Sequence, residues 1–364
     1  MQMGASEASI CAAPFSAHPA VPRPPRLMLW LHRYNQLLAL ATLALITVGG
    51  LVTSTDSGLA VPDWPNTYGY FMFSFPWSQM VGGILYEHGH RLIASIVGLL
   101  TIGLVIWLSR RDSRRWVRQL GWLALAAVVI QGLLGGITVL YFLPPEVSIS
   151  HAGLAQMFFA LIVSLAIFTS HGWLTRYNRD INDERAIIGD SVLRLLTVLT
   201  PASIYIQILI GATMRHTGAG LAIPDFPLAF GEFIPPIWNT LIVLHFSHRV
   251  GAVIVIGLVV ATGGHIWAHH AQRQELVRPA MLLIGVSLVQ FTLGALTVLS
   301  ERAVAINTAH VATGALLFVT AIVLGLRTHR DRFSDEKKSV PSSFPVIVTT
   351  PTTISTPGSS GASG

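Results

Sequence analysis

Four histidines recur in two pairs along this 364-residue chain, at positions where imidazole could bind a metal or a metal cofactor. His90 and His248 lie 158 positions apart in matching segments, and His151 and His310 lie 159 positions apart. Imidazole is a ligand that suits iron, copper and zinc. No carboxylates or thiolates accompany both pairs to complete a tetrahedral shell, so two histidines in each half favour the axial ligands of a haem.

The alternative for any one of these histidines is a polar residue at a helix end that bonds to backbone or to lipid headgroups. Recurrence of both positions at a nearly constant offset favours the cofactor role. Histidines outside the full repeat pattern are interpreted as structural or surface residues, with His245 as the exception to test. They are His88, His216, His245, His265, His269 and His270.

One carboxylate distinguishes the first pair from the second. Glu87 lies three residues before His90, so the two share a face if the segment is helical. The matching place before His248 holds His245. A carboxylate in an apolar segment is costly and usually functional, although it could simply reach lipid headgroups. The asymmetry predicts one reactive site and one site that only holds its cofactor.

The composition is that of a membrane protein. Hydrophobic residues make up 52% of the chain, charged residues 11%, and the mean hydropathy is +0.61, which excludes an ordinary soluble domain. Cys11 is the only cysteine, so neither an internal disulfide nor a cysteine-ligated cluster is possible. Apolar runs of roughly 20 residues can cross about 30 Å of hydrocarbon. Eight such runs fall near residues 36–54, 80–108, 119–141, 150–172, 194–213, 238–267, 280–299 and 303–326.

Basic residues concentrate in alternate loops. Residues 109–118 contain five arginines, whereas residues 56–79 contain no lysine or arginine. The positive-inside rule then places both termini in the cytoplasm and the 56–79 loop outside. Topology therefore accounts for most of the net charge of +6, and no nucleic-acid partner is implied.

The chain also repeats outside the histidines. The stretch "GLAVPDWP" at 58–65 returns as "GLAIPDFP" at 220–227, and "QGLLGGITVL" at 131–140 returns as "QFTLGALTVL" at 290–299. Four crossings return the chain to its starting side, so the two halves share one orientation. The predicted fold is an all-α membrane protein with eight transmembrane helices in two parallel-repeat four-helix bundles. Facing helices of a bundle can ligate a cofactor, and the rigid Pro/Gly loops would cover its edge.

These motifs resemble the haem A synthase family over nearly the whole membrane region. The resemblance is carried by "GLAVPDWP", by "EHGHR" at 87–91 as a form of the family's E-x-x-H-R motif, by the four histidines and by the eight-helix plan. Family members oxidise a ring methyl of haem O to a formyl group by successive hydroxylations, which yields haem A for terminal oxidases. Some members carry a cysteine pair near the outer loop. This chain resembles the cysteine-free branch, so thiol-assisted chemistry is not expected.

The resemblance implies a role for each residue of the pattern. Glu87 would be the catalytic carboxylate, and His90 and His151 would flank the substrate haem. His248 and His310 would ligate a haem b cofactor.

The arginines that follow two of these histidines, Arg91 and Arg249, could pair with haem propionates or reach lipid phosphate. The predicted organisation is a flexible leader at 1–30, a catalytic half with the substrate haem at 31–172, a cytoplasmic linker at 173–193, a half with haem b at 194–328 and a disordered tail at 329–364.

The resemblance also implies haem O as substrate and a bacterial plasma membrane as location. Haem O synthase, an electron-transfer partner and a second copy of the chain are candidate partners, together with the lipid bilayer. The competing function is a di-haem electron-transfer cytochrome that alters neither haem; Glu87 argues against it, because a carrier needs no acid beside one haem. A transporter would predict interrupted helices at mid-membrane.

Overall fold

The computed structural model describes residues 26–174 and 188–333. Within them all long elements are α-helices, and β-pairing is limited to two isolated bridges. The predicted all-α class and the eight membrane-length spans are confirmed. The helices are α1 (Arg26–Ser54), α2 (Gly83–Arg111), α3 (Arg115–Leu140), α4 (Pro145–Phe168), α6 (Ser191–His216), α7 (Thr240–His270), α8 (Gln274–Leu299) and α9 (Val304–Thr328).

Local sequence signals set several of the helix starts. Pro145 occupies the first turn of α4, where a missing N–H has no cost. Asp190 and Asn239 cap α6 and α7, because their side chains accept hydrogen bonds from backbone amides two or three residues into each helix. Between these ends the apolar side chains face lipid or neighbouring helices, and the helical backbone satisfies its own hydrogen bonds, as a membrane requires.

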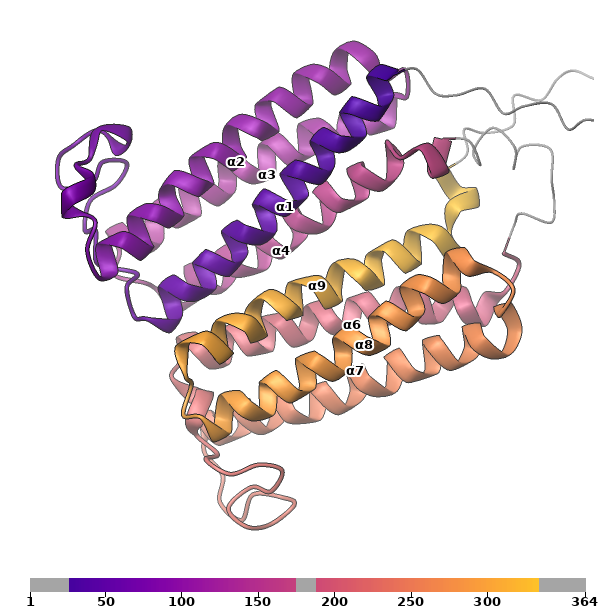
Figure 1. The fold of residues 1–364 in the computed structure, drawn as a ribbon. Coiled ribbons are helices and arrows are strands. Elements are labelled where there is room, and N and C mark those ends of the chain that lie inside the picture. Colours follow the sequence, from indigo (N-terminus) through magenta and orange to yellow (C-terminus); the bar gives the residue numbers. More distant parts are fainter. Residues whose placement is uncertain (1–25, 175–187, 334–364) are drawn as a thin grey trace, which may run out of the picture.

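The eight helices form two groups of four. In each group consecutive helices pack together and the first also packs against the fourth, so the second and fourth helices lie across from each other. Figure 1 shows α1–α4 as one bundle and α6–α9 as the other. The bundles meet where α1 and α4 contact α6 and α9. The buried core there draws Ile46 and Phe159 from the first bundle and Leu283 and Phe318 from the second.

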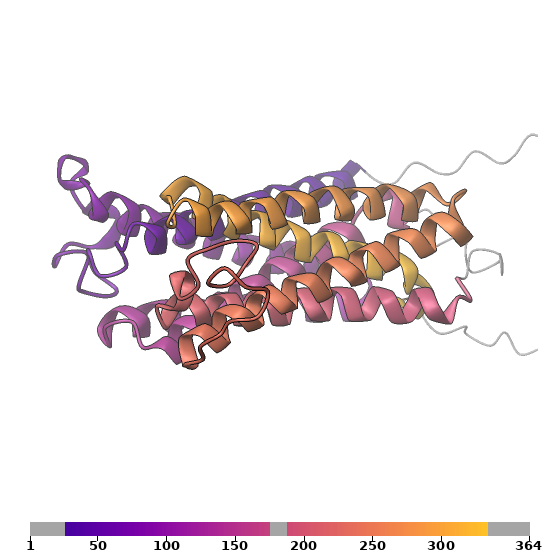
Figure 2. The ribbon, with the colours of Figure 1, turned by 90° about the horizontal axis from the view of Figure 1, so that it is seen from below.

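The two repeated loops have the same tight turn. Asp63 accepts hydrogen bonds at 2.8 Å from the amides of Tyr68 and Gly69. Asp225 does the same, at the same distances, for Phe230 and Gly231. The last two residues of each turn have left-handed backbone with φ between 50° and 83°, which the carboxylate stabilises by satisfying both amides. Both loops lie at one end of the molecule (Figure 2).

The first loop is longer than the second. From Pro65 to His90 there are 25 positions, against 21 from Pro227 to His248, so the first half has four more residues here. This stretch contains two short 3-10 helices, η1 (Met72–Ser74) and η2 (Trp77–Gln79). The loop therefore builds structure beside α2 that the second half lacks.

The element boundaries differ from the predicted organisation at three places. Helix α1 begins at Arg26, inside the predicted leader, because a helix can continue through polar residues beyond an apolar run. Helix α6 begins at Ser191, inside the predicted linker. Residues 330–333 of the predicted tail form helix η5 (Arg330–Phe333), and Phe333 packs 5.2 Å from Phe168. Most of the predicted leader, linker and tail, at residues 1–25, 175–187 and 334–364, lies outside the described residues.

The helix lengths generate a topology prediction. The arginine-rich 109–118 segment and the 56–79 loop lie at opposite ends of α2. We expect a cytoplasm-active reporter fused at Ser113 to be active and an exterior-active reporter fused at Ser78 to be active, with the exchanged fusions silent. Activity of the same reporter at both positions would contradict an α2 that crosses the membrane.

Candidate functional site

The four predicted ligand histidines lie on the second and fourth helix of each bundle. His90 is on α2 and His151 on α4, and the two imidazoles are close enough to interact electrostatically. His248 on α7 and His310 on α9 form the corresponding pair. The structure therefore places the two histidines of each predicted pair on facing helices of one bundle.

Each of these imidazoles lies against a glycine of the preceding helix. The distances from a Cβ built on the glycine to imidazole Cε1 are 3.0 Å for Gly49 and His90, 3.3 Å for Gly135 and His151, 2.9 Å for Gly211 and His248, and 3.1 Å for Gly294 and His310. Real Cβ contacts are rarely this short, so a side chain at these glycines would displace the ring. Glycine at all four places lets the imidazole pack directly on the neighbouring backbone.

Three of the four rings also carry a buried nitrogen with no partner. Nδ1 of His90, His151 and His310 makes no hydrogen bond within the described residues. Nδ1 of His248 lies 3.1 Å from Nε2 of Gln207, which also donates to the backbone oxygen of His248. A buried polar atom without a partner is costly and usually indicates an ion, water or ligand. Paired imidazoles with open nitrogens therefore fit the axial ligands of a haem.

In each bundle one glutamine of the third helix contacts the histidine of the fourth helix. Gln131 donates to the backbone oxygen of His151 at 2.9 Å, and Nε2 of Gln290 lies 3.4 Å from Nε2 of His310. Both glutamines begin the repeated stretches 131–140 and 290–299, and neither was assigned a role from the sequence. Gln131 thus holds the helix turn that carries His151, whereas Gln290 contacts the His310 ring itself. The repeat was the signal that could have found both.

Glu87 is buried and fully engaged. Its Oε1 lies 2.6 Å from Nη2 of Arg91, and its Oε2 accepts a hydrogen bond of 2.7 Å from the amide of Val61 in the outer loop. In the second half His245 takes over the loop contact, because its Nδ1 accepts from the amide of Ile223 at 3.2 Å. Both residues hold a loop, but only the first half adds a buried ion pair.

Arg91 and Arg249 bind the loop backbone. Arg91 donates to the carbonyl oxygen of Asp63 at 2.7 Å, and Arg249 donates to that of Asp225 at 2.6 Å. Each guanidinium makes further bonds to carbonyls of the same loop. The structure thus uses these donors to fasten the loop over the bundle, and pairing with propionates stays a prediction.

The two loop aspartates keep this fastening in place at neutral pH. The amides of Gly231 and Phe230 hold the pKa of Asp225 below its ordinary value. Partial burial raises the pKa of Asp63, but its two amide hydrogen bonds outweigh that effect and the net pKa is lowered. Stability from such a carboxylate is present above its ordinary pKa and is lost only as the pH falls through the lowered value.

A separate cluster lies at the opposite end of the second bundle. Oδ2 of Asp190 lies 2.7 Å from Nε2 of His265 and 2.9 Å from Nε2 of His270. Partial burial raises the pKa of Asp190, but the hydrogen bonds from the Leu193 amide and from the two imidazoles outweigh this effect. The net pKa therefore lies well below its ordinary value. Asp190 already caps α6, so the two imidazoles complete a helix-end contact, as the structural interpretation of these histidines predicted.

The fold and the site together define an all-helical, multi-pass membrane protein with a histidine pair inside each four-helix bundle. The chain belongs to the COX15-CtaA family of cytochrome oxidase assembly proteins, whose sequence profile matches residues 72–322. This match confirms the resemblance predicted from the motifs.

Several bacterial proteins named heme A synthase are similar to this chain. The protein of Symbiobacterium thermophilum is 30% identical over 254 residues, which cover 68% of this chain and 79% of the relative. That of Halalkalibacterium halodurans is 29% identical over 304 residues, 82% of this chain and 97% of the relative. That of Lysinibacillus sphaericus is 25% identical over 316 residues, 84% and 99% of the two chains. The similarity therefore spans both bundles.

The glycine contacts generate a prediction about haem binding. In Gly294→Ala the new methyl would lie 3.1 Å from the His310 ring. Relieving such overpacking costs ~1–3 kcal/mol, so we expect the ring to move and the purified protein to bind less haem with an altered absorption spectrum. Gly285→Ala is the control, because it lies on the same helix with open space around it. Equal haem content and spectra in the two variants would contradict the role of the glycine.

Proposed function

We propose that this protein is a haem A synthase, a membrane oxidoreductase that oxidises a ring methyl of haem O to a formyl group by successive hydroxylations. The observation that carries the proposal is a histidine pair beside a buried carboxylate in a chain whose relatives are named heme A synthase. Family membership supports the same reaction.

The two bundles have different tasks in this proposal. His90 and His151 hold the substrate haem O in the first half, residues 31–172. His248 and His310 ligate a resident haem b in the second half, residues 194–328. The glycine contacts and the open imidazole nitrogens support both assignments. When bound, haem b supplies one-electron redox chemistry.

Glu87 is the candidate catalytic residue because it lies one helical turn from His90 and has no carboxylate counterpart in the second half. Its carboxylate oxygens can accept a proton released as the methyl group is oxidised. While charged, Glu87 holds both the Val61 amide and the Arg91 guanidinium. Protonation would weaken both contacts, so the charge on Glu87 also controls how firmly the outer loop is held.

The loops and the bilayer complete the site. The two arginine-fastened loops cover the outer ends of the bundles and limit access of water. The bacterial relatives support a plasma membrane location, with both termini in the cytoplasm by the positive-inside rule. Haem O synthase, an electron-transfer partner and a second copy of the chain are the partners that this function allows.

The alternative is a di-haem electron-transfer cytochrome that uses both histidine pairs and changes neither haem. The buried Glu87 ion pair in one half favours the enzyme. The deciding experiment is pigment analysis of membranes that produce haem O, with and without this protein. The enzyme predicts haem A only where the protein is present; haem O alone in both membranes would select the carrier.

Glu87→Gln tests the catalytic role directly. Glutamine keeps an acceptor for the Val61 amide but removes the charge beside Arg91. We expect folded protein that retains its resident haem and accumulates haem O or a hydroxylated intermediate, with haem A formation reduced by roughly a hundredfold or more. Reverse-phase separation of extracted haems measures the products.

His245→Gln is the matched control for this variant. It alters the equivalent loop contact in the second half while leaving Glu87 intact. Haem A formation should stay near the wild-type level. If Glu87→Gln also gives normal haem A, the carboxylate is a loop-holding residue and its catalytic role is wrong.

A further inference from the structure

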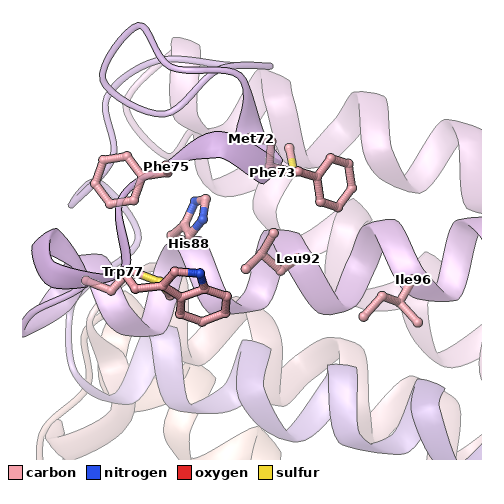
Figure 3. Close-up of a pocket in the computed structure, with 8 residues that line it drawn as sticks. Met72, Phe73, Phe75, Trp77, His88, Leu92 and Ile96 are labelled. Atoms are coloured by element: carbon pink, nitrogen blue, oxygen red, sulfur yellow. The ribbon is translucent and has the colours of Figure 1, made fainter.

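A cavity of about 230 Å³ lies between α2 and the extra residues of the first outer loop. Its walls are apolar and include Met72, Phe73, Phe75, Trp77 and Leu92. The one imidazole of the lining belongs to His88, and Figure 3 shows its ring directed into the space among these side chains. The cavity thus combines largely apolar, aromatic walls with one imidazole.

His88 is held in place from one side. Its Nδ1 lies 2.9 Å from Oγ1 of Thr67, and its ring packs 5.0 Å from Phe75. Nε2 makes no hydrogen bond to the described residues. A hydroxyl can donate to or accept from Nδ1, so the Thr67 contact is compatible with either tautomer. Nε2 can therefore donate a hydrogen bond to a ligand or accept one from it.

The second half shows that the fold does not need this polar pair. The positions that match Thr67 and His88 hold Ala229 and Phe246, at the repeat offsets of 162 and 158. The turn and the arginine contacts are the same in both loops. The four extra residues that help to build η1 and η2 also occur only in the first half. Cavity, histidine and threonine therefore accompany the half that contains Glu87.

The cavity is close to the proposed haem O site. His88 and His90 are two residues apart on α2, so they point to opposite sides of the helix. His90 faces into the bundle, while the cavity continues along the outer face of α2 to Ile96, which is 50% exposed. Only the helix, about 10 Å across, separates the two places. A ligand with a long apolar tail could enter from the lipid along this face.

We propose that this cavity binds the headgroup of an isoprenoid quinone that accepts the electrons of the reaction. A quinone ring is flat and fits between the aromatic and methionine side chains. Nε2 of His88 donates to a quinone carbonyl and, in the other tautomer, accepts from a quinol hydroxyl. The isoprenoid tail lies along the apolar face of α2. This inference rests on the proposed function, because oxidation of the haem O methyl group supplies the electrons.

The electron balance fits two quinones for each haem. Converting a methyl to a formyl group with oxygen from water breaks two of the three carbon–hydrogen bonds and both oxygen–hydrogen bonds of one water molecule. It forms one carbonyl and releases four electrons and four protons. Two quinones take up all of them and become two quinols. With Cys11 as the only cysteine, a pair of thiols within the chain cannot accept these electrons.

The test uses the full-length protein in lipid nanodiscs with a decyl-tailed benzoquinone as probe. The double variant Thr67→Ala and His88→Phe installs the residues that the second half already accommodates, so it should fold and keep the same haem spectrum. Phe233→Ala is the control, an exposed aromatic of the second loop. We expect saturable binding by the wild type and the control, and about tenfold weaker binding by the double variant, on the scale of one lost hydrogen bond.

Equal affinity of the double variant and the wild type would overturn the proposal. So would wild-type binding that never saturates, because it would indicate partition into lipid. Haem A formation in cells by the wild type tests the proposed function separately from the quinone site. If haem A forms but quinone binding fails, only the quinone site is wrong; if haem A does not form, the proposed function itself fails, and the acceptor role with it.

Discussion

The close approach of each imidazole to a glycine on the neighbouring helix is the constraint on which the rest of the structure depends. A side chain at Gly49, Gly135, Gly211 or Gly294 would press against the facing imidazole ring. Lipid provides no hydrophobic drive for helix association, so close packing through small residues is what joins membrane helices. The same glycines thus let the helices approach and aim two imidazoles into each bundle.

The two repeated loops make the two halves chemically different. Arg91 and Arg249 fasten both loops through backbone carbonyls. The first loop is also held by the carboxylate of Glu87, and beside that loop His88 faces a cavity along α2. In the proposed function, both bundles keep one architecture for holding a haem, and the first bundle adds a proton acceptor and a place for an electron acceptor.

The sequence predicted the eight helices and the histidine pairs well, because apolar length and a repeat are local signals. The glycine contacts were not predictable, since they depend on how two helices pack. The arginines were interpreted as partners of haem propionates or of lipid phosphate, which stays a prediction. Their bonds to loop carbonyls 24 and 28 residues away were not predicted, because they depend on how the loops fold. His88 was interpreted as structural or surface because it breaks the repeat. In the structure it lines the cavity for which we propose a ligand. The catalytic role of Glu87 and the ligand roles of the four histidines stay predictions.

The division of labour between the halves is the central claim, and the resident haem of two histidine variants tests it most directly. Haem content and the low-spin absorption spectrum would be measured for purified His310→Ala and His151→Ala, together with extracted haem products. The account predicts that His310→Ala loses or strongly changes the resident haem, whereas His151→Ala keeps it and forms no haem A. An unchanged spectrum in His310→Ala, or loss of the resident haem in His151→Ala, would contradict the account.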